Sequence, residues 1–273
     1  MSVHAEVRRI SVPQLSEYKG KQKIVALTSY SVPFARLLDG HLDMILVGDS
    51  TAMVGYGMPD TLSITPRMMT AHARAVVGAT RRVCVVVDMP FGSYQESPER
   101  AFRHAAQMLS GSGAQAVKIE GSDVLAPTTR FMVERGVPVL AHVGLMPQYV
   151  NVMGGFKAQG FSDEVAERIL QDAIAHQEAG AFAVVLEGVT ESLGRRITES
   201  LSIPTIGIGA SPACDGQILV TEDILGLSGS RIPKFAKQFA DVGAVINEAV
   251  AQYAHDVRDG NFPALENCFG VKK

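Results

Sequence analysis

Short apolar runs alternate with amphipathic segments along most of this sequence. Seven runs are rich in β-branched residues and apolar on both faces, as parallel strands covered by helices are. They lie at 23–28, 43–48, 83–88, 116–120, 137–142, 182–187 and 204–209. A weaker run at 217–225 is interpreted as an eighth strand. The pattern therefore predicts a mainly parallel sheet.

Patterns typical of helices fill the intervals, and Thr65-Pro66 and Ser97-Pro98 are good helix starts because a hydroxyl can cap a helix that begins with proline. Helices are expected at about 31–39, 66–80, 98–112, 123–135, 163–179, 190–200 and 233–257. Eight strand–helix units in 273 residues favour a closed (β/α)₈ barrel over a doubly wound open sheet. We expect one domain over 1–273, with a short N-terminal lead and an irregular tail from about 258.

Composition narrows the class of protein. A hydrophobic content of 47% allows a large core, and a net charge of −3 gives no reason to expect nucleic acid or an anionic membrane as a partner. No apolar stretch is long enough to span a bilayer, and the first 22 residues lack the apolar core of a secretory signal. The three cysteines share no metal-type spacing. We therefore expect a cytoplasmic protein.

Acidic residues end four of the apolar runs: Asp49, Asp88, Glu120 and Glu187. Active sites of (β/α)₈ barrels form at the carboxyl ends of the strands, so these carboxylates should converge on one mouth. One such acid alone could equally cap a helix or pair with a surface cation, but four together make that interpretation weaker. Converging carboxylates repel one another, and Mg²⁺ is the hard cation that their oxygens favour.

Two basic groups belong to the same predicted mouth. Lys118 lies two residues before Glu120, so strand alternation puts both on one face, towards the barrel axis if Glu120 points there. A lysine inside a barrel must be paired or must bind an anion. A lone histidine at a strand end is more often structural, but the neighbouring charges favour a functional role for His142.

These residues predict metal-assisted enolate chemistry on a small 2-oxo acid. Mg²⁺ could chelate the carboxylate and keto oxygens of such an acid and stabilise the enolate formed when its C3 proton leaves. Lys118 and His142 could neutralise the bound oxygens. The remaining acids suffice as metal ligands, directly or through water, which leaves Glu187 as the candidate base.

Seven sequence blocks resemble the ketopantoate hydroxymethyltransferase family, in the family's order, over about residues 12–257. They are LVGDS (46–50), DMPFGSY (88–94), VKIEG (117–121), PVLAHVGLMPQ (138–148), GGFKAQG (154–160), ESLSIPTIGIGASPACDGQILV (199–220) and IPKFAK (232–237). The resemblance implies a barrel of the phosphoenolpyruvate mutase and isocitrate lyase type, Mg²⁺ and a homo-oligomer, a decamer. It also implies transfer of a hydroxymethyl group from 5,10-methylenetetrahydrofolate to 3-methyl-2-oxobutanoate (2-oxoisovalerate), giving 2-dehydropantoate on the route to pantothenate and coenzyme A.

The resemblance also implies roles for individual residues. Its metal ligands fall on Asp49, Asp88 and Glu120, its catalytic groups on Glu187, Lys118 and His142, and its substrate contacts on Ser50, Asp49, Asp88 and Lys118. Ser50 could instead be a turn or helix-cap hydroxyl. Two positions depart from the family, since Ser31 stands where it usually has aspartate and Ser211 where it has glycine.

Two other functions stay open at this point. One is a lyase or mutase of the related barrel group, although the absence of a block such as KKCGH argues against isocitrate lyase. The other is a barrel kept as a structural or binding subunit, which the intact charged set argues against. The glycine-rich segments 51–62 and 150–162 are interpreted as mouth loops, and 150–162 is predicted to close over the substrate, although a mobile connection would explain its glycines equally well.

Overall fold

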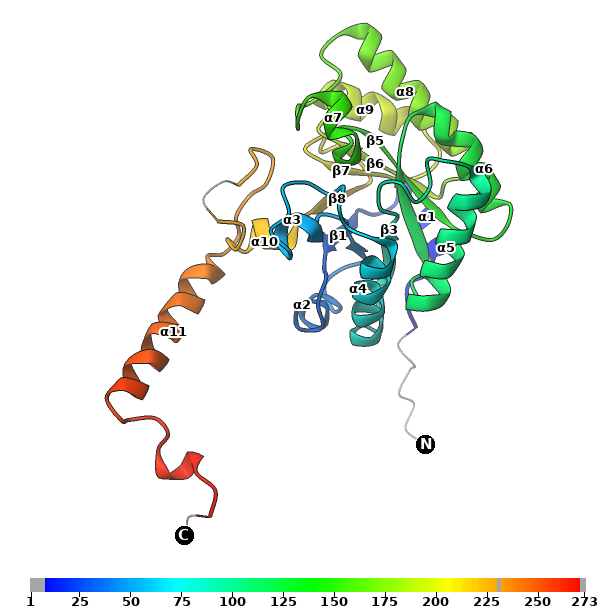
Figure 1. The fold of residues 1–273 in the computed structure, drawn as a ribbon. Coiled ribbons are helices and arrows are strands. Elements are labelled where there is room, and N and C mark those ends of the chain that lie inside the picture. The colour runs from blue at the N-terminus through cyan, green and yellow to red at the C-terminus, as the bar shows by residue number, and fades with distance from the viewer. Residues whose placement is uncertain (1–7, 230–231, 271–273) are drawn as a thin grey trace. The chain divides into compact units, whose positions relative to one another are not determined.

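The computed structural model describes residues 8–229 and 232–270. Within these residues, eight parallel strands form a closed barrel in the order β1 to β8 (Figure 1). They are β1 Ile24–Thr28, β2 Met44–Val47, β3 Cys84–Asp88, β4 Ala116–Glu120, β5 Val139–Gly144, β6 Ala183–Glu187, β7 Thr205–Ile208 and β8 Gly216–Leu219. The predicted (β/α)₈ barrel is confirmed.

Helices follow most of the strands, and the longer ones before residue 221 lie outside the barrel (Figure 1). The helices are α1 Val12–Ser16, α2 Val32–Leu38, α3 Thr51–Val54, α4 Pro66–Ala79, α5 Pro98–Ser112, α6 Ala126–Val133, α7 Val150–Met153, α8 Asp163–Glu178, α9 Glu191–Ser200, α10 Thr221–Ile224 and α11 Val242–Arg258, with 3₁₀ turns η1 Asp123–Leu125, η2 Pro147–Tyr149 and η3 Leu265–Asn267. Thr65 and Ser97 cap α4 and α5 as predicted, each accepting from a backbone N–H three residues on.

Several element boundaries differ from the sequence predictions, and three of the differences have a clear local explanation or consequence. Strand β5 continues to Gly144, so His142 lies inside the strand and not at its end. Strand β8 stops at Leu219, because the chain turns into α10 at Thr221. Helix α11 begins at Val242 instead of 233, because Asp241 supplies the cap: its Oδ1 accepts from a backbone N–H at 3.0 Å.

Apolar side chains of the strands alternate between the barrel interior and the helical layer. In β4, Ala116 belongs to the interior cluster, whereas Val117 and Ile119 pack in the cluster shared with α4 and α5. Lys118 and Glu120 therefore share the inward face with Ala116, as strand alternation predicted. Beneath them the interior is filled by apolar side chains, which removes water from the polar groups above.

The segment before β1 closes the barrel interior at the amino ends of the strands. Ile10 and Leu15 are buried in the same cluster as the inward residues of the strands. Ser11 caps the short helix α1 that carries Leu15, through a reciprocal pair of hydrogen bonds with Gln14. The described part of the N-terminal lead therefore contributes Ile10 and Leu15 to the barrel core.

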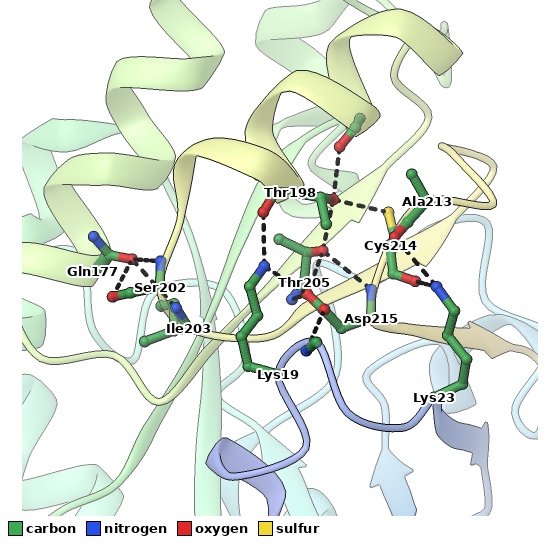
Figure 2. A network of polar contacts seen from close by, with 12 residues as sticks. Lys19, Lys23, Gln177, Thr198, Ser202, Ile203, Thr205, Ala213, Cys214 and Asp215 are labelled. Atoms are coloured by element: carbon green, nitrogen blue, oxygen red, sulfur yellow. Dashed lines mark hydrogen bonds and ion pairs between the residues drawn. The ribbon is translucent and has the colours of Figure 1, made fainter.

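Asp215 joins the strands at the seam where the barrel closes (Figure 2). Its Oδ2 accepts from the Thr205 backbone N–H at 2.9 Å and lies 2.9 Å from Lys19 Nζ, while Oδ1 accepts from the Gly20 N–H at 3.2 Å. The Asp215 carbonyl accepts from the N–H of Ile24 at 2.8 Å. One residue therefore connects β1, β7 and β8 at their amino ends.

Replacing Asp215 with asparagine should lower the free energy of unfolding at pH 7 by about 1–3 kcal/mol, because buried donors lose a charged acceptor. Burial alone would raise the pKa of Asp215, but the Thr205 N–H and Lys19 outweigh it and lower that pKa. Because the pKa is lower in the folded protein, the ionised carboxylate of Asp215 stabilises the fold above pH 4, which is about its ordinary pKa. This stabilisation is lost as pH falls from there through the lowered pKa of the folded protein. Denaturant unfolding at pH 7 and pH 3 should show the difference shrinking in acid; a difference that grows in acid would contradict this assignment.

Contacts divide the chain into two compact units, Met1–Thr221 and Glu222–Lys273. All eight strands of the described ranges lie in the first unit. The second carries α11, on which Val245, Val250 and Tyr253 are 64%, 60% and 59% exposed in this single chain. The single domain over residues 1–273 stays a prediction.

Candidate active site

Six side chains predicted from the sequence lie together at the carboxyl end of the barrel. They are Asp49, Asp88, Lys118, Glu120, His142 and Glu187. The first five are buried, and the side chain of Glu187 keeps 16% of its surface exposed. Glu187 is therefore the acid that a molecule entering from the mouth can reach.

Lys118 is the centre of this cluster. Its Nζ lies 3.2 Å from Asp88 Oδ1 and 3.3 Å from Glu120 Oε1. The same ammonium lies 3.1 Å from His142 Nδ1. Strand register explains these contacts, since Asp88 is paired with Lys118, and Glu120 with His142, across neighbouring strands. The cluster is thus fixed by backbone pairing in the sheet.

His142 carries a proton on Nε2. Its Nε2 lies 2.9 Å from the Leu145 carbonyl oxygen, which can only accept. Its Nδ1 lies 3.1 Å from Lys118 Nζ and 3.4 Å from Glu120 Oε1. Glu187 Oε2 lies 3.3 Å from the same Nε2. His142 therefore stands between the ammonium and the Glu187 carboxylate and orients the latter.

Ser50 occupies the N-cap position of α3 but makes no capping hydrogen bond within the described chain. Its Oγ instead lies 2.7 Å from the hydroxyl of Tyr30, which follows β1. A Cβ at Gly48 would lie 2.8 Å from Ser50 Oγ and 3.6 Å from Asp88 Oδ2, so glycine leaves room here for both side chains. The helix-cap alternative for Ser50 is therefore not supported.

Gln148 and Tyr94 belong to the site but were not predicted from the residues alone. Gln148 Nε2 donates to Asp49 Oδ2 at 2.8 Å, and its backbone N–H donates to Glu120 Oε2 at 3.0 Å. The hydroxyl of Tyr94 donates to Gln148 Oε1 at 2.7 Å. Both residues stand in loops, where strand polarity gives no signal, although both close blocks of the family resemblance.

Burial and charge shift the ionisation of the cluster. Burial, together with the charges of Asp88 and Glu120, raises the pKa of Asp49 well above its usual range, and burial also raises the pKa of Asp88. Burial would raise the pKa of Glu120 too, but the Lys118 ammonium, His142 and the Gln148 backbone N–H together outweigh it and hold that pKa at about 2. Burial raises the pKa of Glu187 to about 7. Burial therefore disfavours negative charge on Asp49, Asp88 and Glu187 more than the one ammonium of Lys118 favours it.

The donor set fits a hard divalent cation. Asp88 Oδ1 is buried and accepts no hydrogen bond from the described residues, although Lys118 lies within ion-pair distance. As the side chains stand, no group of three His, Cys, Asp or Glu residues in the described ranges encloses a metal position, and Lys118 lies between Asp88 and Glu120. The carboxylate oxygens of Asp49, Asp88 and Glu120 are nevertheless the hard donors that Mg²⁺ favours.

Ser31 and Ser211, the two residues that depart from the family pattern, differ in the hydrogen bonds that their side chains make. Ser31 is the N-cap residue of α2, without a side-chain capping bond in the described structure. Ser211 Oγ donates to Glu191 Oε1 at 2.9 Å and accepts from the Ala213 N–H at 3.0 Å. The Ser211 hydroxyl thus links its own loop to the start of α9.

A sequence model of the ketopantoate hydroxymethyltransferase family matches residues 9–265. The chain belongs to this family. The sequence is 57% identical to 3-methyl-2-oxobutanoate hydroxymethyltransferase 1 of Pseudomonas aeruginosa (strain UCBPP-PA14) over 273 residues, which are all of both chains. It is also 57% identical to 3-methyl-2-oxobutanoate hydroxymethyltransferase of Bordetella petrii, over 100% of this chain and 99% of that one. Because the chain belongs to the ketopantoate hydroxymethyltransferase family, the predicted enzyme class, a transferase, is confirmed.

Two solved structures of other proteins have the same fold as this chain. 2,3-Dimethylmalate lyase, a member of the PEP mutase/isocitrate lyase superfamily, matches with a TM-score of 0.58 at 18% identity, over 94% of this chain and 88% of that one. Phosphonopyruvate hydrolase matches with a TM-score of 0.64 at 12% identity, over 96% and 92%. The predicted barrel type is confirmed.

Proposed function

We propose that this enzyme transfers a hydroxymethyl group from 5,10-methylenetetrahydrofolate to 3-methyl-2-oxobutanoate and forms 2-dehydropantoate, for pantothenate and coenzyme A synthesis. Two full-length relatives at 57% identity carry the name of this activity. The observation that carries the proposal is the cluster at the mouth, where a half-buried base adjoins buried carboxylates and a buried ammonium.

Glu187 is the base in this proposal. The pKa of its carboxyl is raised to about 7 by burial, and His142, with Nε2 3.3 Å from Glu187 Oε2, orients it. A base with a pKa near the working pH combines a useful ionised fraction with a strong pull on the proton. Glu187 would take the C3 proton of the oxo acid. One C–N bond of the folate methylene group would open to give an iminium, and C3 would attack its carbon while the C=N electron pair moves to nitrogen. Water would then displace that nitrogen as the folate amine, its oxygen becoming the hydroxyl group and one of its protons passing to the amine.

Asp49, Asp88 and Glu120 would hold Mg²⁺, directly or through water. When bound, the ion would polarise the keto group and stabilise negative charge on its oxygen. Lys118 would contribute a second positive charge near the bound acid, and Ser50, paired with Tyr30, would donate a hydrogen bond to it. The apolar barrel interior beneath these groups would strengthen each of these interactions by excluding water.

The decisive assay is consumption of 3-methyl-2-oxobutanoate by the purified enzyme, with Mg²⁺ and the folate each supplied or withheld. We expect turnover only when both are present. A lyase or mutase of the related barrel group would act without folate, so folate-independent consumption would contradict the proposal. Failure of the protein to bind Mg²⁺ would favour a barrel without enzymatic activity.

The pH dependence of turnover should follow the ionisation of Glu187. Since the base must be ionised, kcat/KM should rise as pH increases through about 7 and level off above it. Initial rates measured between pH 5.5 and 8.5 would test this expectation. A kcat/KM that falls as pH rises from 6 to 8 would exclude an ionised Glu187 as the base.

The segment 150–162 is proposed to close over the bound substrate. Helix α7 ends at Gly154, whose φ is +67°, and the Gln159 N–H donates to the Gly188 carbonyl at 2.7 Å, one residue after Glu187. Val152 and Phe161 are 85% and 81% exposed. Substrate with Mg²⁺ should therefore slow proteolysis within 150–162. Equal cleavage rates with and without both would count against closure.

We infer a homo-oligomer, and a decamer from the family resemblance. The exposed apolar residues of α11, among them Val245, Val250 and Tyr253, are the kind of surface that a single chain rarely leaves uncovered. Light scattering coupled to size exclusion would give the number of chains. No helix of the described residues has the length and apolar character needed to cross a membrane. A cytoplasmic location stays a prediction.

A further inference from the structure

Gln148 reaches the carboxylate cluster from the loop that follows β5. The residue is 3% exposed and lies in the 3₁₀ turn η2. Its Nε2 donates to Asp49 Oδ2 at 2.8 Å and to the Met89 carbonyl at 3.0 Å. Its backbone N–H donates to Glu120 Oε2 at 3.0 Å. One residue therefore binds two of the three carboxylates proposed to hold the metal.

The orientation of the Gln148 amide is fixed by its neighbours. The Met89 carbonyl can only accept, so the atom 3.0 Å from it must be the NH₂ group. The Tyr94 hydroxyl donates to Oε1 at 2.7 Å and itself accepts from the Glu120 backbone N–H at 3.1 Å. Turning the amide over would place two acceptors against each other at Met89. Gln148 therefore always presents a donor to Asp49.

We propose that Gln148 is a positioning residue that orients Asp49 and Glu120 for the divalent cation; this inference rests on the proposed function. It holds Oδ2 of Asp49 and Oε2 of Glu120, and so fixes the rotation of both carboxylates. The other oxygen of Glu120 is directed into the cluster, 3.3 Å from the Lys118 ammonium. Ligands already held in place bind a metal more tightly, because binding does not have to order them.

A purely structural role would look different. The bond to the Met89 carbonyl is enough to anchor the loop, and it needs neither carboxylate. The contacts with Asp49 and Glu120 instead join two ligands that come from β2 and β4, on opposite sides of β3. Loss of the Gln148 amide should therefore affect metal affinity more than stability.

The test is calorimetric titration of Mg²⁺ into the substrate-free, full-length protein and its variants. Gln148→Met keeps the length and the backbone N–H but removes the amide, and it should raise the Kd for Mg²⁺ by about 10–100-fold. The matched control is Gln115→Met. Gln115 precedes β4 at the other end of the barrel, where its Oε1 accepts from the Val85 N–H at 2.8 Å. The control should lower the thermal midpoint comparably and leave the Kd unchanged.

Gln148→Glu is the second variant, for use should the methionine variant fail to fold. It keeps the shape of the side chain but exchanges the donor to Asp49 for an acceptor, so the Kd should again rise. A wild-type Kd in either folded variant would overturn the proposal. Tighter Mg²⁺ binding by Gln148→Glu would also overturn it, because position 148 would then be supplying a ligand.

Turnover measured on the same preparations separates this inference from the proposed reaction. An active wild-type enzyme whose Gln148 variants keep the wild-type Kd would overturn the positioning role alone. An inactive wild-type protein whose Kd rises in the variants would overturn the reaction and uphold the positioning role.

Discussion

Replacing Glu187 with glutamine should slow the exchange of the C3 hydrogen of 3-methyl-2-oxobutanoate into deuterated water by about 10²–10⁴-fold. Glutamine keeps the shape of the side chain but cannot accept the proton. Exchange reports proton removal without requiring the folate, so the effect is assigned to that step. NMR of the oxo acid with Mg²⁺ would measure the rate, and calorimetry would show whether the oxo acid still binds.

Glu191→Gln provides the matched control for this change. Glu191 begins α9, four residues after Glu187, and its half-exposed side chain pairs with Arg195 at 2.7 Å. Its removal should leave the exchange rate near that of the wild type. Rapid exchange in Glu187→Gln would show that another group takes the proton.

Replacing Lys118 with methionine should lower the free energy of unfolding by about 3–5 kcal/mol at pH 7, because it leaves buried carboxylates without their cation. Asp88 and Glu120 are the two that lose an ion pair. The pKa of Glu120, held at about 2 largely by Lys118 against the effect of burial, should rise in the variant. That carboxylate stabilises the wild type above its ordinary pKa, so the deficit should be full at pH 7 and shrink below about pH 4.

Denaturant unfolding at neutral and acid pH, without added metal, would measure both effects. Lys21→Met is the control, since Lys21 is exposed on the surface before β1. An unfolding free energy unchanged from the wild type in Lys118→Met would mean that Asp88 and Glu120 are neutral in the folded protein. Lys118 would then form no ion pair with Asp88 or Glu120 in the folded protein.

The meeting of the charged groups could be predicted from the sequence because it follows from strand polarity. Parallel strands in a barrel present their carboxyl ends at one rim, so acids such as Asp88 and Glu120 are brought together wherever the helices lie. The two-residue spacing of Lys118 and Glu120 then fixes their common face. These rules need only the order and the length of the elements.

The contacts made by loop residues could not be predicted in this way. Gln148 reaches Asp49 because the turn after β5 folds inward, and no periodic pattern encodes that path. Tyr94 likewise stands six residues beyond the end of β3. The start of α11 was missed for a related reason: its apolar pattern continues upstream, and only Asp241 in the folded chain determines where the helix begins.

The seam fastened by Asp215 has a consequence for synthesis on the ribosome. Lys19 and Asp215 are 196 residues apart, and β1 pairs directly with β8. The ring cannot close until nearly the whole barrel has left the ribosome, so the nascent chain passes through an open sheet with unpaired outer strands. Chaperone engagement should therefore be strongest on chains that end shortly before β8.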